Sequence, residues 1–337
     1  MRHLTRVGIG FTGVPWSYPQ TLELVKYADE KGYDSAWMAE DYFTRNAPVV
    51  LGAWGSETKK VKLGTGILPL FTRHVALGAM TAATLDEVNG GRTIFGLGFG
   101  LTQLMTVSMG FPKPPALTAI REYCEAFRMI LKGENVNYDG QYVKCKNVKL
   151  GITPVRNKVP IYLAANQQKM LRLAGEVADG VLLTAGTTPE HVRYAFDKVA
   201  EGAKQSGRNK DDINVTGFVF VAASEDKNFN AFHDIPSLRI FAAYCLSGEY
   251  GELIADLSDY DRSKIAKIRD SLAAGDANTA GSFVDEHMVH TMSAMGTPDE
   301  VRSRLREFAK EGKGKFQPVI FLIGGDLKLG VEAAAKV

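Results

Sequence analysis

Two adjacent carboxylates, Glu40 and Asp41, are the residues of this sequence whose type and spacing best suit proton transfer. They follow the apolar run 35–39, so we expect them at the end of a β-strand. Successive side chains of a strand point to opposite faces, so at most one of the two carboxylates faces a given site. In a partly buried position that carboxyl has a raised pKa and can pass a proton. The alternative is that Asp41 caps the turn that follows the strand.

A glycine run, Gly96-Leu97-Gly98-Phe99-Gly100, directly follows another apolar segment. A dinucleotide-binding fingerprint has a different third glycine spacing and needs an acidic residue for the ribose, and none stands between Gly100 and Arg121. Glycine lets a backbone come close to a ligand because it has no side chain. We therefore interpret Gly98 and Phe99 as part of a strand that lies against a flat ligand.

The histidines and cysteines do not form a pattern typical of metal sites. His287 and His290 stand three residues apart on an expected helix, but a metal ion needs further ligands that the sequence does not place beside them. We expect no metal and interpret both as helix-packing residues. The cysteines are far apart and form no CxxC motif, which is typical of free thiols in a reducing cytoplasm; they are Cys124, Cys145 and Cys245.

The elements that position these residues alternate regularly along the chain. Strands are expected at 7–11, 35–39, 61–68, 93–97, 160–164, 180–183, 214–222 and 318–323. Helices are expected at 20–31, 47–57, 74–87, 118–132, 169–178, 189–206 and 297–311. Strict alternation implies a parallel sheet, and eight strands in 337 residues favour an α/β fold of the closed (β/α)₈ type, a TIM barrel, over an open sheet.

Two stretches exceed this repeat. Residues 134–150 predict a β-hairpin before the fifth strand, and residues 229–295 predict a long, mostly helical insertion between the seventh and eighth strands. Long insertions on a barrel usually serve as lids or substrate walls. No low-complexity linker divides the chain, so we expect one domain over residues 1–337.

The composition is that of a soluble globular protein. Hydrophobic residues make up 45% and charged residues 23%, with a formal net charge of +2. This balance argues against nucleic acid as a partner. The chain has neither a signal-peptide core at its start nor an apolar run long enough to cross a membrane, so we expect a cytoplasmic protein that acts on a small molecule.

Several motifs together resemble a known group of enzymes. They are WMAEDY at 37–42, KLGTGI at 62–67, FTRH at 71–74, TLDEVNGGR at 84–92, GLGFG at 96–100, VPIYLAA at 159–165, MLRLAGEVADG at 170–180 and GTPDE at 296–300. With these motifs the chain resembles the bacterial luciferase-like superfamily of flavin and deazaflavin barrel enzymes. Within it, the chain is most similar to the methylenetetrahydromethanopterin reductases, which depend on coenzyme F-420 (F420), an 8-hydroxy-5-deazaflavin. The segment 84–92 is the most diagnostic, although it leads into a strand and carries no chemistry.

The resemblance implies a site at the C-terminal ends of the strands, where barrel enzymes keep their catalytic groups. It implies a non-prolyl cis peptide bond at Gly66–Ile67, next to Leu68, behind the central ring of the cofactor. It also implies a homodimer or higher homo-oligomer. The phosphate-bearing tail of the cofactor is expected at the loops after the fifth and sixth strands, which are formed by Ala165, Asn166, Gln167, Thr184, Ala185, Gly186 and Thr187.

The chain departs from the pattern of these enzymes at three places, one of them after strand five, where a small-residue pair is usual and this chain has Asn166-Gln167. Strand two usually ends in an Asp-His pair, where this chain has Glu40-Asp41. The methanopterin reductases carry a glutamate late in strand one, where this chain has Gly10.

Three functions remain open from the sequence. The first is an F420-dependent oxidoreductase that transfers a hydride between the deazaflavin and a small organic substrate, with methylenetetrahydromethanopterin as a candidate and Glu40 or Asp41 as the catalytic carboxylate. The second is an FMN-dependent monooxygenase supplied with reduced flavin by a partner reductase. The third is a non-catalytic barrel that binds a flavin.

Overall fold

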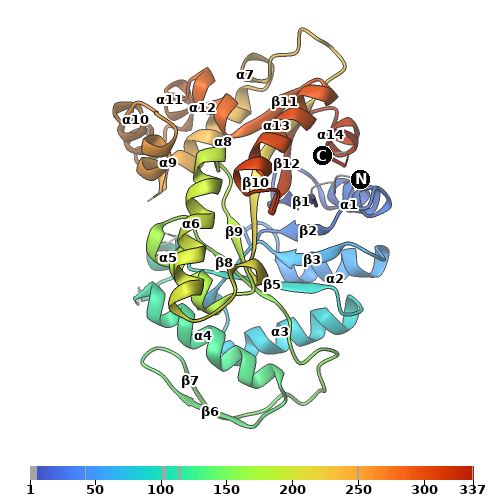
Figure 1. The fold of residues 1–337 in the computed structure, drawn as a ribbon, viewed down its shortest axis with the longest axis vertical. Helices are drawn as coiled ribbons and strands as arrows, with labels where there is room; N and C mark the ends of the chain where they lie inside the picture. Colours follow the sequence, from blue (N-terminus) through green and yellow to red (C-terminus); the bar gives the residue numbers. More distant parts are fainter. Residues whose placement is uncertain (1–5, 42, 101–103, 113–114, 249, 336) are drawn as a thin grey trace.

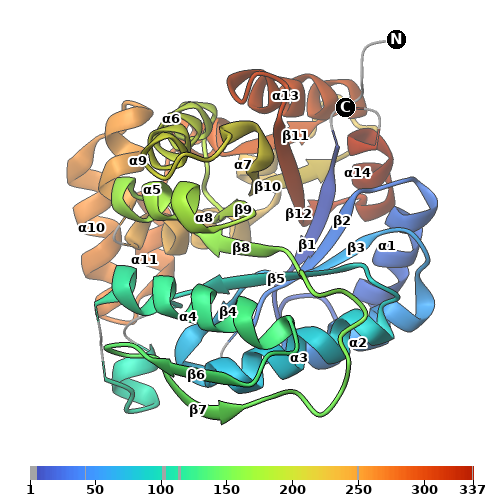
Figure 2. The same ribbon diagram turned by 60° about the horizontal axis from the view of Figure 1, so that its bottom comes forward.

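The computed structural model describes residues 6–41, 43–100, 104–112, 115–248, 250–335 and 337. Within this part, eight parallel strands pair in a ring, and the ring is closed because β12 pairs with β1 and β10 pairs with both β9 and β12 (Figures 1 and 2). The closed parallel barrel expected from the sequence is confirmed. Its strands are β1 (Gly8–Phe11), β2 (Ser35–Met38), β3 (Lys62–Thr65), β5 (Thr93–Gly98), β8 (Ile161–Ala164), β9 (Gly180–Leu183), β10 (Asn214–Ala223) and β12 (Phe316–Gly325).

Helices surround the ring, as Figure 2 shows. They are α1 (Tyr18–Glu30), α2 (Ala47–Glu57), α3 (Val75–Val88), α4 (Ala116–Leu131), α5 (Gln168–Val177), α6 (Pro189–Gln205), α13 (Pro298–Glu311) and α14 (Leu327–Ala334). Side chains fix their starts: Asn46 accepts from the Val49 N–H before α2, and Thr188 accepts from the His191 N–H before α6. Helix α14 was not expected from the sequence, and neither were the short helical segments η1 (Leu70–Thr72), η2 (Leu104–Ser108) and η3 (Lys210–Asp212).

The third strand differs from the expectation. Residues 61–68 were expected to form one strand, but β3 ends at Thr65, and Leu68–Pro69 form a separate strand, β4, that pairs with β5. The Gly66–Ile67 peptide bond between them is cis, as expected from the motif, and the ladder is interrupted at this bond.

The barrel interior is filled by large rings packed against glycines. A Cβ atom at Gly64 would lie 2.3 Å from the Trp37 ring, and one at Gly180 would lie 2.6 Å from the Tyr162 ring. Trp37 and Tyr162 are buried, with ring centroids 5.5 Å apart. The barrel is therefore a packed core at this level, and ligands are accommodated at its mouth.

The hairpin of β6 (Val136–Asp139) and β7 (Lys144–Val148) lies at one end of the molecule (Figure 1). The Glu122 carboxylate of α4 holds its turn by accepting the backbone N–H groups of Gln141, Tyr142 and Val143 at 2.8, 2.8 and 2.9 Å. Although partial burial opposes ionisation, these three donors keep the pKa of Glu122 below its ordinary value.

The long insertion is a group of short helices at the other end (Figure 1). They are α7 (Ala231–Asp234), α8 (Pro236–Ser247), α9 (Gly251–Leu257), α10 (Arg262–Ala273), α11 (Ala277–Ser282) and α12 (Glu286–Thr291). Leu238 and Leu246 of α8 belong to the same buried cluster as Phe220 and Phe321 of the barrel strands. The last insertion residues are not helical, because Ser293–Gly296 form β11 beside β10. None of the described helices is long and apolar enough to cross a membrane.

Candidate functional site

The accessible part of the barrel mouth lies at the C-terminal ends of neighbouring strands. At the ends of β2, β3, β5, β8 and β9, the side chains are half-exposed. The ends of β10 and β12 are covered, because α8 packs over them. Most of the predicted site residues meet at these ends, as the strand order requires. The half-exposed positions are Glu40, Asp41, Gly66, Ile67, Phe99, Ala164, Asn166, Thr184 and Ala185.

Glu40 is engaged with protein groups on both of its oxygens. Oε1 accepts from Arg73 Nη1 at 2.9 Å, and Oε2 accepts from the Ala47 N–H at the start of α2 at 2.7 Å. Both partners of the ion pair are largely buried, with side-chain exposures of 13% for Glu40 and 17% for Arg73. The negative charge also lies where the N-terminus of α2 favours it. This arrangement suits holding two loops together, and a catalytic role for Glu40 stays a prediction.

Asp41 points in a different direction from Glu40, as expected for consecutive residues at a strand end. Its Oδ2 accepts from the Gly13 N–H at 3.1 Å, which ties the loop after β2 to the loop after β1. Arg45 donates to the Trp16 carbonyl at 2.8 Å across the same two loops. Burial raises the pKa of Asp41, although the Gly13 N–H and the Thr12 hydroxyl oppose the shift. Asp41 therefore holds a proton more readily than an ordinary aspartate does.

The glycines of the 96–100 run lie close to other parts of the protein. A Cβ at Gly96 would lie 1.8 Å from the Thr65 carbonyl oxygen, and a Cβ at Gly98 would lie 3.0 Å from both Ile67 and Ala164. Close approach of the third strand and of the Ile67 side chain explains these glycines without a ligand. Whether Gly98 also lies against a cofactor stays a prediction.

The other three residues predicted beside the cofactor ring differ in their burial and in their contacts. Leu68 pairs with Leu97 and is buried, so its side chain faces the core between the barrel and the helices. Phe99 packs edge-on against Phe71, with centroids 4.8 Å apart. Ile67 is half-exposed at the mouth.

The loops after β8 and β9 are bound to each other. Asn166 Oδ1 accepts from the Thr184 N–H at 3.1 Å, and the buried Thr187 hydroxyl donates to the Thr184 carbonyl at 2.8 Å. Gly186 has a positive φ of 86°, which favours glycine. Among the described residues, the backbone N–H groups of Ala185 and Gly186 have no hydrogen-bond acceptor. Successive free N–H groups of this kind bind anions.

The helical insertion covers the same loop. The Tyr250 hydroxyl donates to the Ala185 carbonyl at 3.2 Å, and a Cβ at Gly186 would lie 2.9 Å from Cys245 Cβ in α8. Of the remaining predicted tail residues, Ala165 is buried with its side chain in the core, and Gln167 is exposed at the N-cap of α5.

Sequence reasoning missed His191, which is fully buried beneath these loops. Its Nε2 lies 2.9 Å from the Asn166 carbonyl oxygen. The available signal was its position, the third residue of a helix that begins directly after a strand-end loop. That signal is weak, because helix starts often carry polar residues for capping alone.

Of the two histidines expected to pack, His287 makes side-chain contacts, whereas His290 is exposed. His287 Nε2 lies 3.1 Å from the Ser258 carbonyl oxygen, and its ring packs edge-on against Tyr260. Across the described residues, no group of three or more His, Cys, Asp or Glu side chains is arranged to hold a metal ion.

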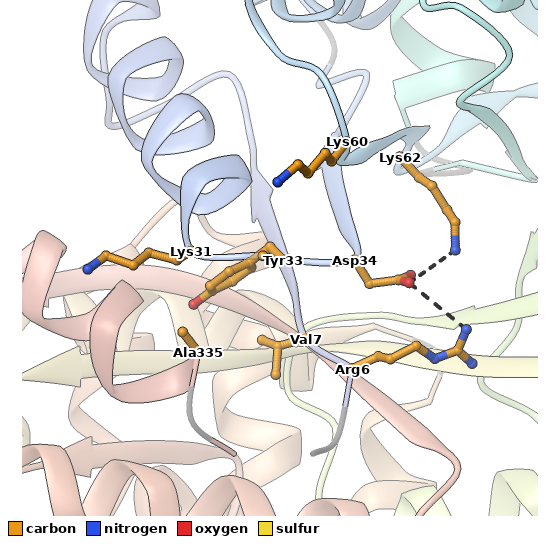
Figure 3. A pocket seen from close by; sticks show the side chains of 9 residues that line it. Arg6, Val7, Lys31, Tyr33, Asp34, Lys60, Lys62 and Ala335 are labelled. Atoms are coloured by element: carbon orange, nitrogen blue, oxygen red, sulfur yellow. Dashed lines mark hydrogen bonds and ion pairs between the residues drawn. The ribbon is translucent and has the colours of Figure 1, made fainter. Parts of the chain in front are cut away.

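A cavity of about 380 Å³ lies at the opposite, N-terminal end of the strands (Figure 3). Its cationic side chains are largely paired: Lys62 Nζ lies 3.0 Å from Asp34 Oδ1, Arg6 lies 3.9 Å from the same oxygen, and Lys31 Nζ lies 3.3 Å from Glu332. Residues at this end of a barrel generally serve stability. We therefore place the functional site at the mouth.

The chain is similar to several known proteins. A family model described as luciferase-like monooxygenase matches residues 4–313. The 5,10-methylenetetrahydromethanopterin reductase of Methanopyrus kandleri is 32% identical over 326 residues, which cover 92% of this chain and 91% of that protein. An F420-dependent glucose-6-phosphate dehydrogenase of Microbacterium testaceum is 31% identical over 245 residues, covering 68% and 70%. The solved coenzyme F420 dependent tetrahydromethanopterin reductase from Methanopyrus kandleri has a TM-score of 0.87 at 30% identity and covers 99% of this chain and 98% of its own.

Proposed function

Because the chain belongs to the luciferase-like monooxygenase family, we propose that it is an F420-dependent oxidoreductase that transfers a hydride between the deazaflavin and a small organic substrate. The family and the enzyme class expected from the motifs, an oxidoreductase, are confirmed. The preference for F420 over FMN rests on the reductases and dehydrogenases that are about a third identical to this chain.

The observation that carries the proposal is the donor set at the ends of β8 and β9. The Ala185 and Gly186 N–H groups and the Asn166 side-chain amide lack acceptors among the described residues. Neutral donors at a loop that enters a helix N-terminus suit a phosphate. We propose that Asn166, Gln167, Thr184, Ala185, Gly186 and Thr187 hold the cofactor tail, with Ala165 as a buried support.

The ring is proposed to lie against Gly66, Ile67 and Leu68 on one side, with Gly98 and Phe99 beside it. When bound, the deazaflavin supplies a ring carbon that accepts or donates a hydride. The chain contributes orientation and exclusion of water, the latter through the insertion helices packed over β10 and β12. Asp41 is the proposed proton-holding residue: its Oδ2 accepts the Gly13 N–H, so a proton is held at Oδ1.

A pterin is the first substrate to test, because three 5,10-methylenetetrahydromethanopterin reductases are 29% to 32% identical over 85% or more of this chain. Position 10 argues for a difference in substrate recognition, since a glycine there cannot supply a carboxylate.

The test is a parallel titration of the purified protein with F420 and FMN, followed by anaerobic hydride transfer from reduced F420 to methylenetetrahydromethanopterin. We expect tighter binding of F420 and oxidation of its reduced form by the substrate. Preferential FMN binding with oxygen-dependent turnover would instead support the monooxygenase. Tight binding without turnover of any donor would support a non-catalytic flavin-binding barrel.

We also propose that the protein forms a homodimer through the outer faces of α2 and α3. Val49, Leu77, Met80 and Val88 on these faces are 70%, 50%, 48% and 53% exposed. Helices that are apolar on all sides are normally buried. A two-fold interface sets a surface against a second copy of itself. The charged residues of both helices are Glu57, Asp86 and Glu87, and Asp86 is buried. The interface therefore places no cluster of like charges in contact.

The three cysteines are free thiols, and Cys124 and Cys145 are buried. Free thiols are typical of the reducing cytoplasm, which we propose as the compartment of this enzyme.

A further inference from the structure

His191 links the first turn of α6 to the loop after β8. It is the third residue of α6, and its backbone N–H donates to the Thr188 hydroxyl at 3.2 Å. Its ring is 0% exposed, and Nε2 lies 2.9 Å from the Asn166 carbonyl oxygen. A carbonyl oxygen can only accept, so Nε2 carries the proton in this contact.

Asn166 passes this constraint to the next loop. Its main-chain carbonyl is bound by His191, while its side-chain Oδ1 accepts from the Thr184 N–H at 3.1 Å. The amide therefore has a fixed orientation, and its Nδ2 has no acceptor within the described residues. His191, Asn166 and Thr184 form one connected path, from the buried ring of His191 to the loop whose Ala185 and Gly186 N–H groups have no acceptor among the described residues.

The ring of His191 is neutral at physiological pH. Burial lowers its pKa to about 4, and the hydrogen bond to Asn166 opposes that shift only in part. Nδ1 is therefore unprotonated, and it is buried without a hydrogen-bond partner in the described structure. Leaving a buried acceptor unpaired is unfavourable, so packing alone gives no reason for a histidine here. The Nε2–H to Asn166 is the contact that an apolar residue cannot make.

We propose that His191 is a positioning residue for anion binding, which fixes Asn166 so that its amide and the Ala185–Gly186 N–H groups converge on a phosphate of the cofactor tail. His191 does not touch the phosphate; it acts through Asn166. This inference rests on the proposed function. It adds to the cofactor site a buried residue, His191, that neither the motifs nor the comparisons indicated.

The test separates the phosphate contribution from general stability. Affinities for FMN and riboflavin, and for F420 and its phosphate-free deazaflavin core, are measured by fluorescence quenching. The proteins are the wild type, His191→Leu, His191→Gln and the control His74→Gln. His74 is matched because its Nε2 also lies 2.9 Å from a backbone carbonyl, that of Lys144 in the hairpin.

We expect His191→Leu to lose about tenfold in affinity for FMN and F420 and to keep its affinity for the two phosphate-free ligands. His191→Gln, whose amide N–H can donate to Asn166, should recover most of the loss, and His74→Gln should bind as the wild type does. Equal losses for ligands with and without phosphate, or no loss, would overturn the proposal.

A second measurement covers the case in which His191→Leu does not fold. In ¹⁵N-histidine NMR spectra of the wild type, we expect His191 to be the Nε2–H tautomer and its Nε2 resonance to shift when FMN is added but not when riboflavin is added. An Nδ1–H tautomer, or equal shifts with both ligands, would refute the positioning role. A wild type that binds none of the four ligands would refute the proposed function itself.

Discussion

The ring of Phe218 occupies the space that a side chain at Gly10 would need: a Cβ at residue 10 would lie 2.2 Å from Phe218 Cε1. Phe218 comes from β10 and Gly10 from β1, and the same ring lies 3.3 Å from a Cβ placed at Gly66. The glycine that departs from the family pattern in strand one is thus matched by a large residue across the barrel. The Phe218 ring thus fills the space that a side chain at position 10 would take.

This pair predicts non-additive effects on stability. Gly10→Ala should destabilise the fold by roughly 1–3 kcal/mol through overpacking, and Phe218→Ala should cost about 3–5 kcal/mol by leaving a cavity. The double variant should cost less than the sum, because the smaller residue at 218 makes room for the new methyl group. Denaturant unfolding of the four proteins measures the coupling, and additive values would contradict the packing argument.

The pattern of strands and helices was predictable because each barrel unit buries its own apolar run. Thr188 before α6 and Thr297 before α13 cap their helices as local sequence suggests. The bounds that failed depend on tertiary contacts. Ser293–Gly296 form a strand because they pair with the part of β10 that extends beyond β9, and no local pattern shows that these two distant segments meet.

The candidate site was predictable in position but not in detail. The strand-end rule brought Glu40, Asn166 and Thr184 to one end of the barrel. The partners of those residues come from distant segments: Arg73 lies 33 residues from Glu40, and His191 lies 25 residues from Asn166. Pairing of this kind depends on how loops meet in three dimensions, which periodicity does not encode.

Asp41 predicts a pH dependence of stability. Since its pKa is raised in the folded protein, the folded state holds the proton more tightly than the unfolded state, whose ordinary value is 3.8. Its contribution to stability is therefore present at low pH and is lost as pH rises from about 4 through the raised pKa. Asp41→Asn keeps an acceptor for the Gly13 N–H, so at pH 7 it should be at least as stable as the wild type.

Asp179 provides the control of opposite sign. Its burial favours the neutral form, but the Ile161 N–H, Arg128 and Lys158 together hold its pKa below 3.8. Its stabilising contribution is present above that pH and lost as pH falls, so Asp179→Asn should be less stable than the wild type at pH 7. Thermal unfolding from about pH 2 to about pH 8 compares the two. Parallel curves for Asp41→Asn and the wild type would exclude a raised pKa for Asp41.

Asn166 predicts a charge-specific loss of cofactor binding. In Asn166→Asp, one carboxylate oxygen still accepts the Thr184 N–H, but the other replaces the free amide with a negative charge. Binding of FMN and F420 should weaken by about tenfold or more through repulsion of the phosphate, with riboflavin little affected. Asn135→Asp, on the distant hairpin side, is the matched change of charge. A comparable loss for riboflavin would show that the loop itself had collapsed.

The outer faces of α2 and α3 predict the oligomeric state. Leu77 and Met80 stand about one turn apart on α3 and are half-exposed. Leu77→Glu and Met80→Glu would each place a negative charge in the proposed two-fold interface. By symmetry, the other subunit would add a second like charge there. We expect light scattering to show a dimer for the wild type and a monomer for both variants, with cofactor affinity retained. Tyr244→Glu, on the 57% exposed position of α8, should remain dimeric. A monomeric wild type would refute the proposed dimer. A dimer that survives both charges would place the interface away from α2 and α3.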